Sequence, residues 1–436
     1  MVPSNTDSEP GLERRKIAII SSGLAKIPVD RGGGIEEHVW KIAIPIAAQG
    51  HKVVVIDRSY SKDDKRVENR DGIRIERLRA PLVTWHRLGN LLGKRTYTIR
   101  FVLNQVIFFL SIINSKILSG FDVVVSFETI QSFLFALFGG STIRNKLFYV
   151  YSSSSFPPGK FMGLSQRRLV KIAEDVTRIA LRNMRCIICQ NLELKSALLR
   201  LGIEARRITV IPPGIDIDEW GELLDSNHFQ RPTQKQEKII LFVGRINPQK
   251  GIEYAVQALS LLSKSRADLS LRLLIVGPDA FFDAWYESDY SKSLKALVKM
   301  HSLDGRVQFL GAVTRKELGS LYRNADFVVV PSLSETYGLV VSEAMSFGKP
   351  VIGTDVAGIR MQIQNGKDGI IVPTRNPAAI ASALEFLIDN PDEMKRISNN
   401  ALASARTRTW SIVANRFLKA FEEIPPWTAR SMKTDK

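Results

Sequence analysis

Residues 325–354 read Ala-Asp-Phe-Val-Val-Val-Pro-Ser-Leu-Ser-Glu-Thr-Tyr-Gly-Leu-Val-Val-Ser-Glu-Ala-Met-Ser-Phe-Gly-Lys-Pro-Val-Ile-Gly-Thr. The apolar run Ala325–Val330 predicts a buried strand, and residues 351–354 predict a second one. Between them, a polar turn leads into a helix predicted over Gly338–Phe347. A strand, a helix and a strand in this order form a βαβ unit, in which the two strands are parallel. The stretch therefore predicts an α/β fold with a parallel sheet.

Two carboxylates, Glu335 and Glu343, lie in the segment Pro331–Glu343 between these strands. Open α/β sheets bind ligands at the carboxyl ends of their strands, where the next helix begins. The N–H groups and dipole of a helix start favour phosphate, and Gly338 permits a close approach of the backbone. A carboxylate farther along the helix can accept hydrogen bonds from ribose. The segment predicts a nucleotide diphosphate site; the alternative is that both glutamates are ordinary surface acids.

The alternation of strands and helices extends over the whole chain and predicts a doubly wound α/β architecture. One cycle begins at Lys16–Ser21 and another at Ile239–Val243, so we predict two Rossmann-like domains. The N-terminal domain is predicted over residues 1–210 and the C-terminal domain over residues 211–410. The segment 411–436, which opens with an amphipathic helix, is predicted to pack back on the first domain.

Two further segments follow predicted strands and are candidate ligand contacts. Gly244, Arg245 and Lys250 come directly after the strand Ile239–Val243. Arg and Lys at the carboxyl end of a strand can converge on a phosphate; the alternative is an exposed basic loop. Gly32-Gly33-Gly34 precedes a predicted helix and lets the backbone approach a ligand. Its spacing does not meet the dinucleotide fingerprint, and a surface loop is the alternative.

Positive charge is concentrated in the first half of the chain. Residues 1–213 contain 33 Lys and Arg against 18 Asp and Glu, and residues 214–436 contain 28 against 26, so the halves carry +15 and +2 of the net +17. The densest part is residues 74–100, and residues 160–185 predict a basic helix. This asymmetry indicates a surface that contacts anionic membrane headgroups or a phosphorylated acceptor. The alternative is a basic face that is merely solvated. No nucleic-acid motif accompanies it, so nucleic acid is not predicted as a partner.

The N-terminal segment, the apolar runs and the cysteine and histidine positions predict a cytoplasmic protein without a metal site. Residues 1–15 lack an apolar signal segment, and the apolar run Phe101–Ile113 is too short to cross a bilayer. Cys186 and Cys189 lie in an apolar run with no second ligand pair, which favours buried thiols over a zinc or redox site. The histidines show no metal-ligand spacing.

Five stretches together resemble retaining glycosyltransferases of the GT-B fold, family 4 type. They occur in the family's order between Lys16 and Trp410 and are Gly33–Val39, Gly50–Val53, Val210–Asp216, Phe242–Gly251 and Pro331–Glu343. The resemblance implies two Rossmann-like domains facing across a cleft, the first binding the acceptor and the second the nucleotide-sugar donor. The implied reaction moves a hexosyl unit to a glycan or lipid-linked acceptor, with no metal or cofactor besides the donor.

The resemblance also assigns roles to individual residues. Arg245 and Lys250 would neutralise the donor diphosphate as it leaves, and Glu335 would lie near the donor sugar. The remaining implied contacts are ribose at Glu343, donor phosphate at Gly244, Gly338 and Leu339, and the acceptor side of the cleft at Gly33 and Gly34. Charge stabilisation by preorganised groups of this kind is usually a large catalytic effect.

The sequence departs from the family pattern at one position that matters. Members often carry a His in the loop near Tyr151–Ser155, where this chain reads Tyr-Ser-Ser-Ser-Ser. Either another side chain contacts the donor sugar or the contact differs. Two other functions therefore stay open: a GT-B epimerase or hydrolase of nucleotide sugars, and a non-catalytic subunit that binds them.

Overall fold

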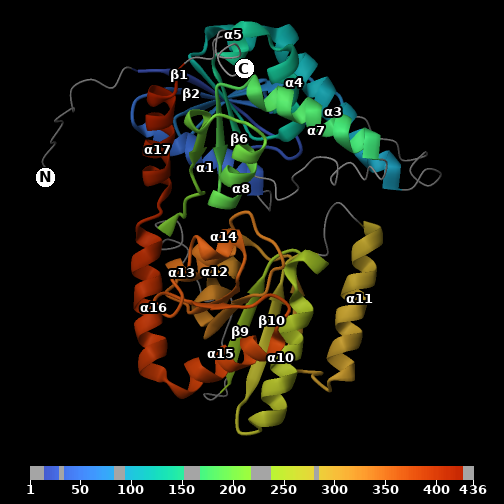
Figure 1. Ribbon diagram of the computed structural model, residues 1–436, viewed down its shortest axis with the longest axis vertical. Helices are drawn as coiled ribbons and strands as arrows, with labels where there is room; N and C mark the ends of the chain where they lie inside the picture. Colours follow the sequence, from blue (N-terminus) through green and yellow to red (C-terminus); the bar gives the residue numbers. More distant parts are fainter. Residues whose placement is uncertain are drawn as a thin grey trace, which may run out of the picture. The chain divides into compact units, whose positions relative to one another are not determined.

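The computed structural model describes residues 14–28, 34–82, 94–151, 167–217, 237–278 and 284–425. The chain folds as two compact units, each built around one mainly parallel sheet (Figure 1). Unit 1 comprises Met1–Cys189, Ala197–Thr209 and Ala414–Lys436, and unit 2 comprises Gln190–Ser196 and Val210–Val413. The predicted α/β fold is confirmed.

Unit 1 contains an eight-stranded sheet in the order β3-β4-β2-β1-β5-β6-β7-β8. Neighbours from β4 through β7 pair in parallel, whereas β3 pairs antiparallel with β4. The hairpin formed by β3 was not expected, because its sequence Val-Glu-Asn-Arg has one apolar residue and that residue is exposed. The strands are β1 (Lys16–Ile20), β2 (Lys52–Arg58), β3 (Val67–Arg70), β4 (Ile73–Leu78), β5 (Val123–Ser126), β6 (Leu147–Tyr151), β7 (Cys186–Cys189) and β8 (Ile208–Val210).

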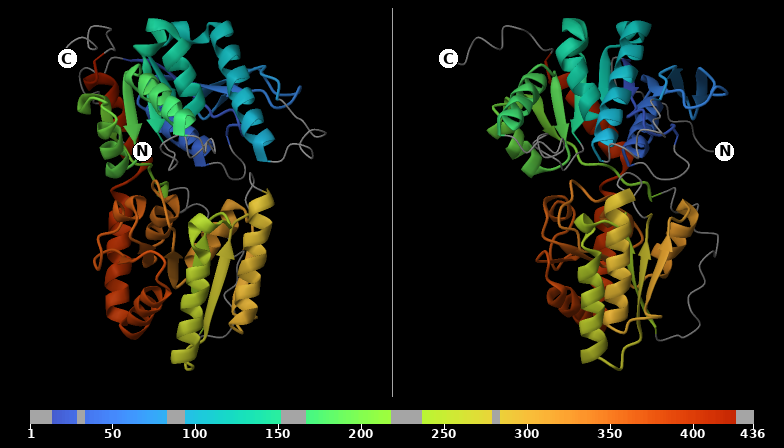
Figure 2. Two further views of the ribbon diagram at one scale, coloured as in Figure 1. Left: turned by 45° about the vertical axis from the view of Figure 1, so that its right-hand side comes forward. Right: turned by 90° about the vertical axis from the view of Figure 1, so that its right-hand side faces the viewer.

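Helices cover both faces of this sheet, so its central strands are buried along their length. Helices α3, α4 and α7 lie side by side as one layer (Figures 1 and 2). The chain's last helix packs on unit 1, where the rings of Phe148 and Phe421 lie 4.8 Å apart and Arg185 donates to the carbonyl of Ile424. The helices are α1 (Gly34–Ala48), α3 (Lys94–Ser115), α4 (Thr129–Phe138), α5 (Gly140–Arg144) and α7 (Arg167–Arg182), together with α8 (Leu192–Arg200) and α17 (Trp410–Glu423), whose first residues belong to unit 2.

Unit 2 contains a six-stranded, wholly parallel sheet in the order β11-β10-β9-β12-β13-β14. Numbered from β9 in chain order, the sequence of strands is 3-2-1-4-5-6, so the order reverses between β9 and β12. In doubly wound sheets, ligands bind at the carboxyl ends of the two strands that flank such a reversal. The strands are β9 (Lys238–Val243), β10 (Leu271–Val276), β11 (Val307–Gly311), β12 (Phe327–Val330), β13 (Val351–Thr354) and β14 (Ile370–Val372).

Alternate residues of these strands build two separate cores, one on each face of the sheet. Ile240 and Phe242 pack with α10, α11 and α15 on one face, and Ile239 and Leu241 pack with α12, α13 and α16 on the other. The helices are α10 (Ile252–Ser265), α11 (Ala284–Met300), α12 (Arg315–Asn324), α13 (Leu339–Ser346), α14 (Ala357–Arg360), α15 (Pro377–Asp389) and α16 (Pro391–Arg406). Across the described residues of both units, no helix has the length and apolar character needed to cross a membrane.

Candidate functional site

Two loops of unit 2 meet where the strand order reverses. The loop after β9 carries Gly244, Arg245 and Lys250, and the loop after β12 carries Glu335 and Gly338. The loops are joined by hydrogen bonds, since the Leu333 N–H donates to the Gln249 carbonyl at 2.8 Å and the Gln249 side chain donates to the Ser334 carbonyl at 3.0 Å. Residues 85 apart in the chain therefore share one site.

The close approach of the two loops requires glycine at position 251. Gly251 has a φ of 62°, and a Cβ placed there would lie 2.3 Å from the Pro331 carbonyl oxygen. An L side chain would be strained by this backbone conformation and would push the loops apart. The short helix Pro248–Lys250 just before it is capped by Asn247, whose side-chain oxygen accepts from the Lys250 N–H at 3.2 Å. The backbone of Lys250 is thus fixed on both sides.

The side chains of Lys250 and Glu335 form an ion pair. Lys250 Nζ lies 2.5 Å from Glu335 Oε1, and the side chains are 19% and 11% exposed. The Ser332 hydroxyl donates to the same carboxylate oxygen at 2.9 Å. This places one cation and one anion, both largely buried, next to the start of α13.

The turn before α13 is held by side chains that carried no signal in the sequence. The fully buried amide of Gln362 donates to the Tyr337 carbonyl at 2.5 Å and to the Gly358 carbonyl at 3.0 Å. The Gly358 N–H donates in turn to the Glu335 carbonyl at 3.1 Å. Asn191 donates to the Thr336 carbonyl at 2.7 Å. These bonds fix the direction in which the N-terminus of α13 points.

Helix α13 begins at Leu339, one residue after Gly338, whose φ of 84° lets the chain turn from the loop into the helix. The first N–H groups of a helix have no acceptor within the helix and, with its dipole, form an anion site. Gly338 is the N-cap and Leu339 the first residue at this helix start, and their binding of phosphate stays a prediction. The sheet edge, the helix start and Lys250 all favour a negatively charged group here.

Glu343 lies one turn into α13 and is partly exposed. Its carboxylate accepts a hydrogen bond from the Tyr322 hydroxyl at 2.8 Å. Burial and, secondarily, the charge of Glu343 raise the pKa of Tyr322 well above its usual value, so the phenol remains a donor. Tyr322 is itself held by stacking on Phe347, with ring centroids 5.3 Å apart. A buried donor thus orients the carboxylate that was expected to bind ribose.

The other predicted site residues are placed differently. Arg245 is exposed and is not part of the Lys250–Glu335 pair. Gly34 is the first residue of α1 in unit 1, and Gly33 lies outside the described residues, as do residues 152–155. Tyr151 is the last residue of β6. The described ranges contain no group of three or more His, Cys, Asp or Glu side chains that could hold a metal ion, and the expected independence from metal stays a prediction.

Unit 1 has a polar network at the equivalent reversal of strand order, between β1 and β5. The hydroxyl of Ser21 donates to Asp57 at 2.6 Å, and the hydroxyl of Ser22 donates to Glu36. The same hydroxyls accept the N–H groups of Gly23 and Leu24, which fixes the loop after β1. All four side chains are buried.

Glu128 lies between β5 and α4, at the same end of the sheet. Its carboxyl caps α4 by accepting from the Gln131 N–H at 2.7 Å, and burial raises its pKa to about 7. The Gln131 amide donates to the Ser22 carbonyl and to Gln105. Glu128 was not predicted from the sequence, although an acid two residues after a buried strand and three residues before a helical Gln is a signal for a helix cap.

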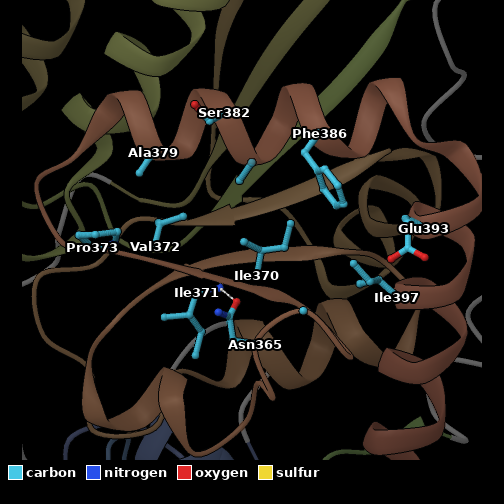
Figure 3. Close-up of a pocket in the computed structure, with 12 residues that line it drawn as sticks. Asn365, Ile370, Ile371, Val372, Pro373, Ala379, Ser382, Phe386, Glu393 and Ile397 are labelled. Atoms are coloured by element: carbon cyan, nitrogen blue, oxygen red, sulfur yellow. Dashed lines mark hydrogen bonds between the residues drawn. The ribbon is translucent and has the colours of Figure 1, made fainter.

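A hollow of about 460 Å³ lies elsewhere in unit 2, beside the edge strand β14 (Figure 3). Ile370 and Val372 of β14 face Ala379 and Phe386 of α15 across it. Its lining contains none of the predicted site residues. It is mainly apolar and offers no convergent charge, so it is not the candidate site.

Comparison with known proteins identifies the family. Residues 32–219 match the family model Glycosyltransferase Family 4, and residues 225–403 match Glycosyl transferases group 1. The D-inositol 3-phosphate glycosyltransferase of Corynebacterium glutamicum is 29% identical over 53% of the chain and 55% of its own length. That of Pseudarthrobacter chlorophenolicus is 32% identical over 50% of the chain and 51% of its own length. The chain thus spans about half the length of the curated relatives it matches.

Solved structures agree with the fold along nearly the whole chain. A sucrose-phosphate synthase from Thermosynechococcus elongatus has a TM-score of 0.74 at 22% identity and covers 94% of this chain and 99% of its own. Anabaena Alr3699/HepE, in complex with UDP and glucose, has a TM-score of 0.68 at 19% identity, covering 93% and 99%. The chain belongs to the GT-B glycosyltransferases of the family 4 type.

Proposed function

We propose that the protein is a retaining glycosyltransferase that moves a hexosyl unit from a nucleotide-diphosphate sugar to a glycan or lipid-linked acceptor. The observation that carries the proposal is the placement of Lys250, Glu335 and the start of α13 at the strand-order reversal of unit 2. A cation and a helix start at this edge suit a diphosphate. The names of the curated relatives, D-inositol 3-phosphate glycosyltransferases, support the same reaction class.

In the proposed chemistry, negative charge develops on the leaving phosphate. Lys250, Arg245 and the first N–H groups of α13 stabilise this charge. Such groups stabilise the transition state because they are in place before the charge develops. Glu343, oriented by Tyr322, would accept hydrogen bonds from ribose, and Gly244 would let the backbone approach the donor. Glu335 would lie near the donor sugar, where positive charge develops at the reacting carbon.

In this proposal the acceptor attacks on the face of the sugar that the phosphate leaves. The leaving phosphate takes the proton of the attacking hydroxyl, so no enzyme nucleophile is needed. Unit 1 would supply the acceptor contacts, through Gly33 and Gly34. A cytoplasmic location and independence from metal belong to the same proposal.

A panel of radiolabelled nucleotide sugars tests the function. Each donor is incubated with the protein and with a membrane extract, a soluble glycan fraction or D-inositol 3-phosphate. Label in a lipid or glycan product supports transfer, and an isomerised or hydrolysed donor supports the epimerase or hydrolase instead. Binding of a donor without any product would support a non-catalytic subunit and overturn the proposal.

We further propose that the α3-α4-α7 layer of unit 1 contacts an anionic membrane. This layer exposes five large apolar side chains, whereas the described residues of α1 and α17 expose none. The most exposed of the five are Leu110 (48%), Phe138 (69%) and Ile179 (51%). Exposed Lys171 and Arg182 on α7 add positive charge to the same layer, whereas Arg178 is paired with Asp175. Apolar anchors beside basic residues are typical of surfaces that bind anionic lipid.

Cosedimentation with vesicles tests this surface. The wild-type protein should bind vesicles of phosphatidylcholine mixed with phosphatidylglycerol and not vesicles of phosphatidylcholine alone. Phe138→Glu should reduce binding roughly thirtyfold, because burying a Phe side chain contributes about 2 kcal/mol. Met300→Glu is the matched control, since Met300 is 71% exposed on α11 of unit 2. Equal binding by both variants, or oligomerisation through the layer without vesicle binding, would contradict the membrane role.

A further inference from the structure

Two residues with separate expected roles form a single ion pair in unit 2. The expected partner of Lys250 is the donor diphosphate and that of Glu335 is the donor sugar. In the structure, Lys250 Nζ lies 2.5 Å from Glu335 Oε1. The ammonium therefore already has an anionic partner at the place where a diphosphate would arrive.

The geometry distinguishes this pair from a loose surface contact. Both side chains are largely buried, so water screens their attraction less than it would at the surface. The Ser332 hydroxyl donates to the carboxylate oxygen that Lys250 contacts, at 2.9 Å. The carbonyl of Ser332 accepts in turn from the Thr354 hydroxyl at 2.5 Å. The carboxylate is thus held by groups of the sheet edge itself.

The backbones of the two residues are fixed independently of their ion pair. The Lys250 N–H is bound by the side chain of Asn247, and the Glu335 carbonyl is bound by the N–H of Gly358. A Cβ on Gly358 would lie 2.7 Å from the Tyr337 backbone, so this contact is close-packed. Removing the charge of Glu335 should therefore change the position of the Lys250 ammonium more than it changes the conformation of the two loops.

From these contacts we propose that Glu335 is a positioning residue for Lys250 and that its carboxylate competes with the diphosphate for the ammonium. The proposal rests on the proposed function, because it assigns the diphosphate to Lys250. Glu335 holds the ammonium of Lys250 at the carboxyl ends of the strands while no diphosphate is bound. When a diphosphate binds, the ion pair between Glu335 and Lys250 weakens. Glu335 thus sets the affinity for the nucleotide as well as contacting the sugar.

Nucleoside diphosphates without a sugar separate this role from sugar binding. Affinities for UDP, GDP and ADP are measured by calorimetry for the wild type, Glu335→Gln, Lys250→Ala and the double variant. We expect Glu335→Gln to bind the preferred diphosphate roughly threefold more tightly, because the competing charge is gone. In the Lys250→Ala background the same change should have no effect, since the two residues act as one unit. Glu385→Gln, which removes an exposed partner of Arg266, should bind like the wild type.

Other outcomes of this cycle would overturn the proposal. If Glu335→Gln leaves the affinity unchanged in both backgrounds, Glu335 serves the sugar alone. If it tightens binding equally in both, the carboxylate repels the diphosphate directly and does not act through Lys250. Weaker binding by Glu335→Gln would mean that the carboxylate only supports the loop.

A second measurement tests the pair without any nucleotide. Acetic anhydride is added at limiting concentration, and acetylation of each lysine is followed by peptide mass spectrometry. Lys250 should be modified several-fold faster in Glu335→Gln than in the wild type, while Lys238, which pairs with Asp326, should keep its rate. An unchanged rate at Lys250 would refute the pair. If no diphosphate binds the wild type, the proposed function fails, and this labelling still decides whether Glu335 holds Lys250.

Discussion

In both units a candidate site lies at the carboxyl ends of the two strands between which the strand order reverses. These strands are β9 and β12 in unit 2 and β1 and β5 in unit 1. The two places have the same topological position but different chemistry. In each sheet the strand order reverses at this point, where ligands bind in doubly wound folds. In unit 1 the acids at the edge, Asp57, Glu36 and Glu128, are buried and bonded to the unit's own hydroxyl and N–H groups. In unit 2 the edge presents a partly exposed Lys250, a helix start and glycines instead.

This difference shows that topology fixes the place of a site but not its use. Polar groups that are already satisfied by the chain hold loops in position, as the Ser21–Asp57 and Ser22–Glu36 bonds hold the loop after β1. The ammonium of Lys250, which pairs with the carboxylate of Glu335, can still exchange this partner for a bound anion. We therefore expect substitutions at the unit 2 edge to change catalysis and substitutions at the unit 1 edge to change mainly stability.

The largest expected effect is that of Lys250→Ala. Turnover should fall about 10²–10³-fold, because a preorganised donor to the leaving phosphate is lost. Affinity for the nucleoside diphosphate should weaken less than turnover, since the helix start remains. Initial rates at saturating donor, together with calorimetry, check this. Lys238→Ala is the control, because Lys238 is the first residue of β9, at the end of the strand away from the Lys250 loop, and pairs with Asp326. Turnover equal to that of the wild type would remove Lys250 from the leaving-group site.

Sequence patterns predicted the fold of unit 2 more closely than that of unit 1. The strand predicted over residues 351–354 has the observed bounds, and the one predicted over Ala325–Val330 begins two residues later, because fully buried parallel strands are continuous apolar runs. The strand β3 was missed, since an edge strand exposed to solvent has no such run. The helix α16 was also missed, because polar residues dominate its sequence and it buries only Ile397, Ala401 and Ala405.

The candidate site could be located from the sequence, but its contacts could not. The order of strand and loop places Lys250 and Glu335 at the same sheet edge. Their ion pair depends on the packing of Gly251 against Pro331, which no local pattern encodes. Gln362, which binds the turn before α13, lies in the turn after α14, and Tyr322 lies on α12, so neither has a fixed sequence spacing to Glu335 and Glu343. The catalytic roles of Lys250 and Glu335 stay predictions.

A second prediction tests the stabilising role of the unit 1 edge through pH. Burial raises the pKa of Glu128 from 4.5 to about 7, so the folded state keeps a proton that the unfolded state loses over this range. Stability due to this group is therefore complete below pH 4.5 and falls as the pH rises to 7, by on the order of 3 kcal/mol. Glu128→Gln should abolish this loss, because the amide oxygen can still cap α4 without charge.

Urea unfolding of both proteins at pH 4.5 and pH 7 measures the difference. The buried imidazole of His38, with a pKa lowered to about 3, has the opposite dependence, since it loses stability as the pH falls below 6.5. It is common to both proteins, so it cancels in the comparison. A gap between wild type and variant that does not widen from pH 4.5 to pH 7 would show that Glu128 is ionised in the folded protein. Turnover that falls as far as in Lys250→Ala would show that this edge is catalytic.

The smallest expected effect is that of Glu343→Ala on nucleotide binding. Loss of a carboxylate that accepts ribose hydroxyls should weaken the affinity for the nucleoside diphosphate about tenfold, or about 1.4 kcal/mol. Tyr322→Phe removes only the hydrogen bond that orients the carboxylate, so it should weaken the affinity less. Calorimetry with the deoxyribose form of the nucleotide completes the comparison: if Glu343 binds ribose, the variant should discriminate less between the two forms than the wild type does. Equal discrimination would move the ribose contact away from α13 and leave Glu343 with Tyr322 as a purely structural pair.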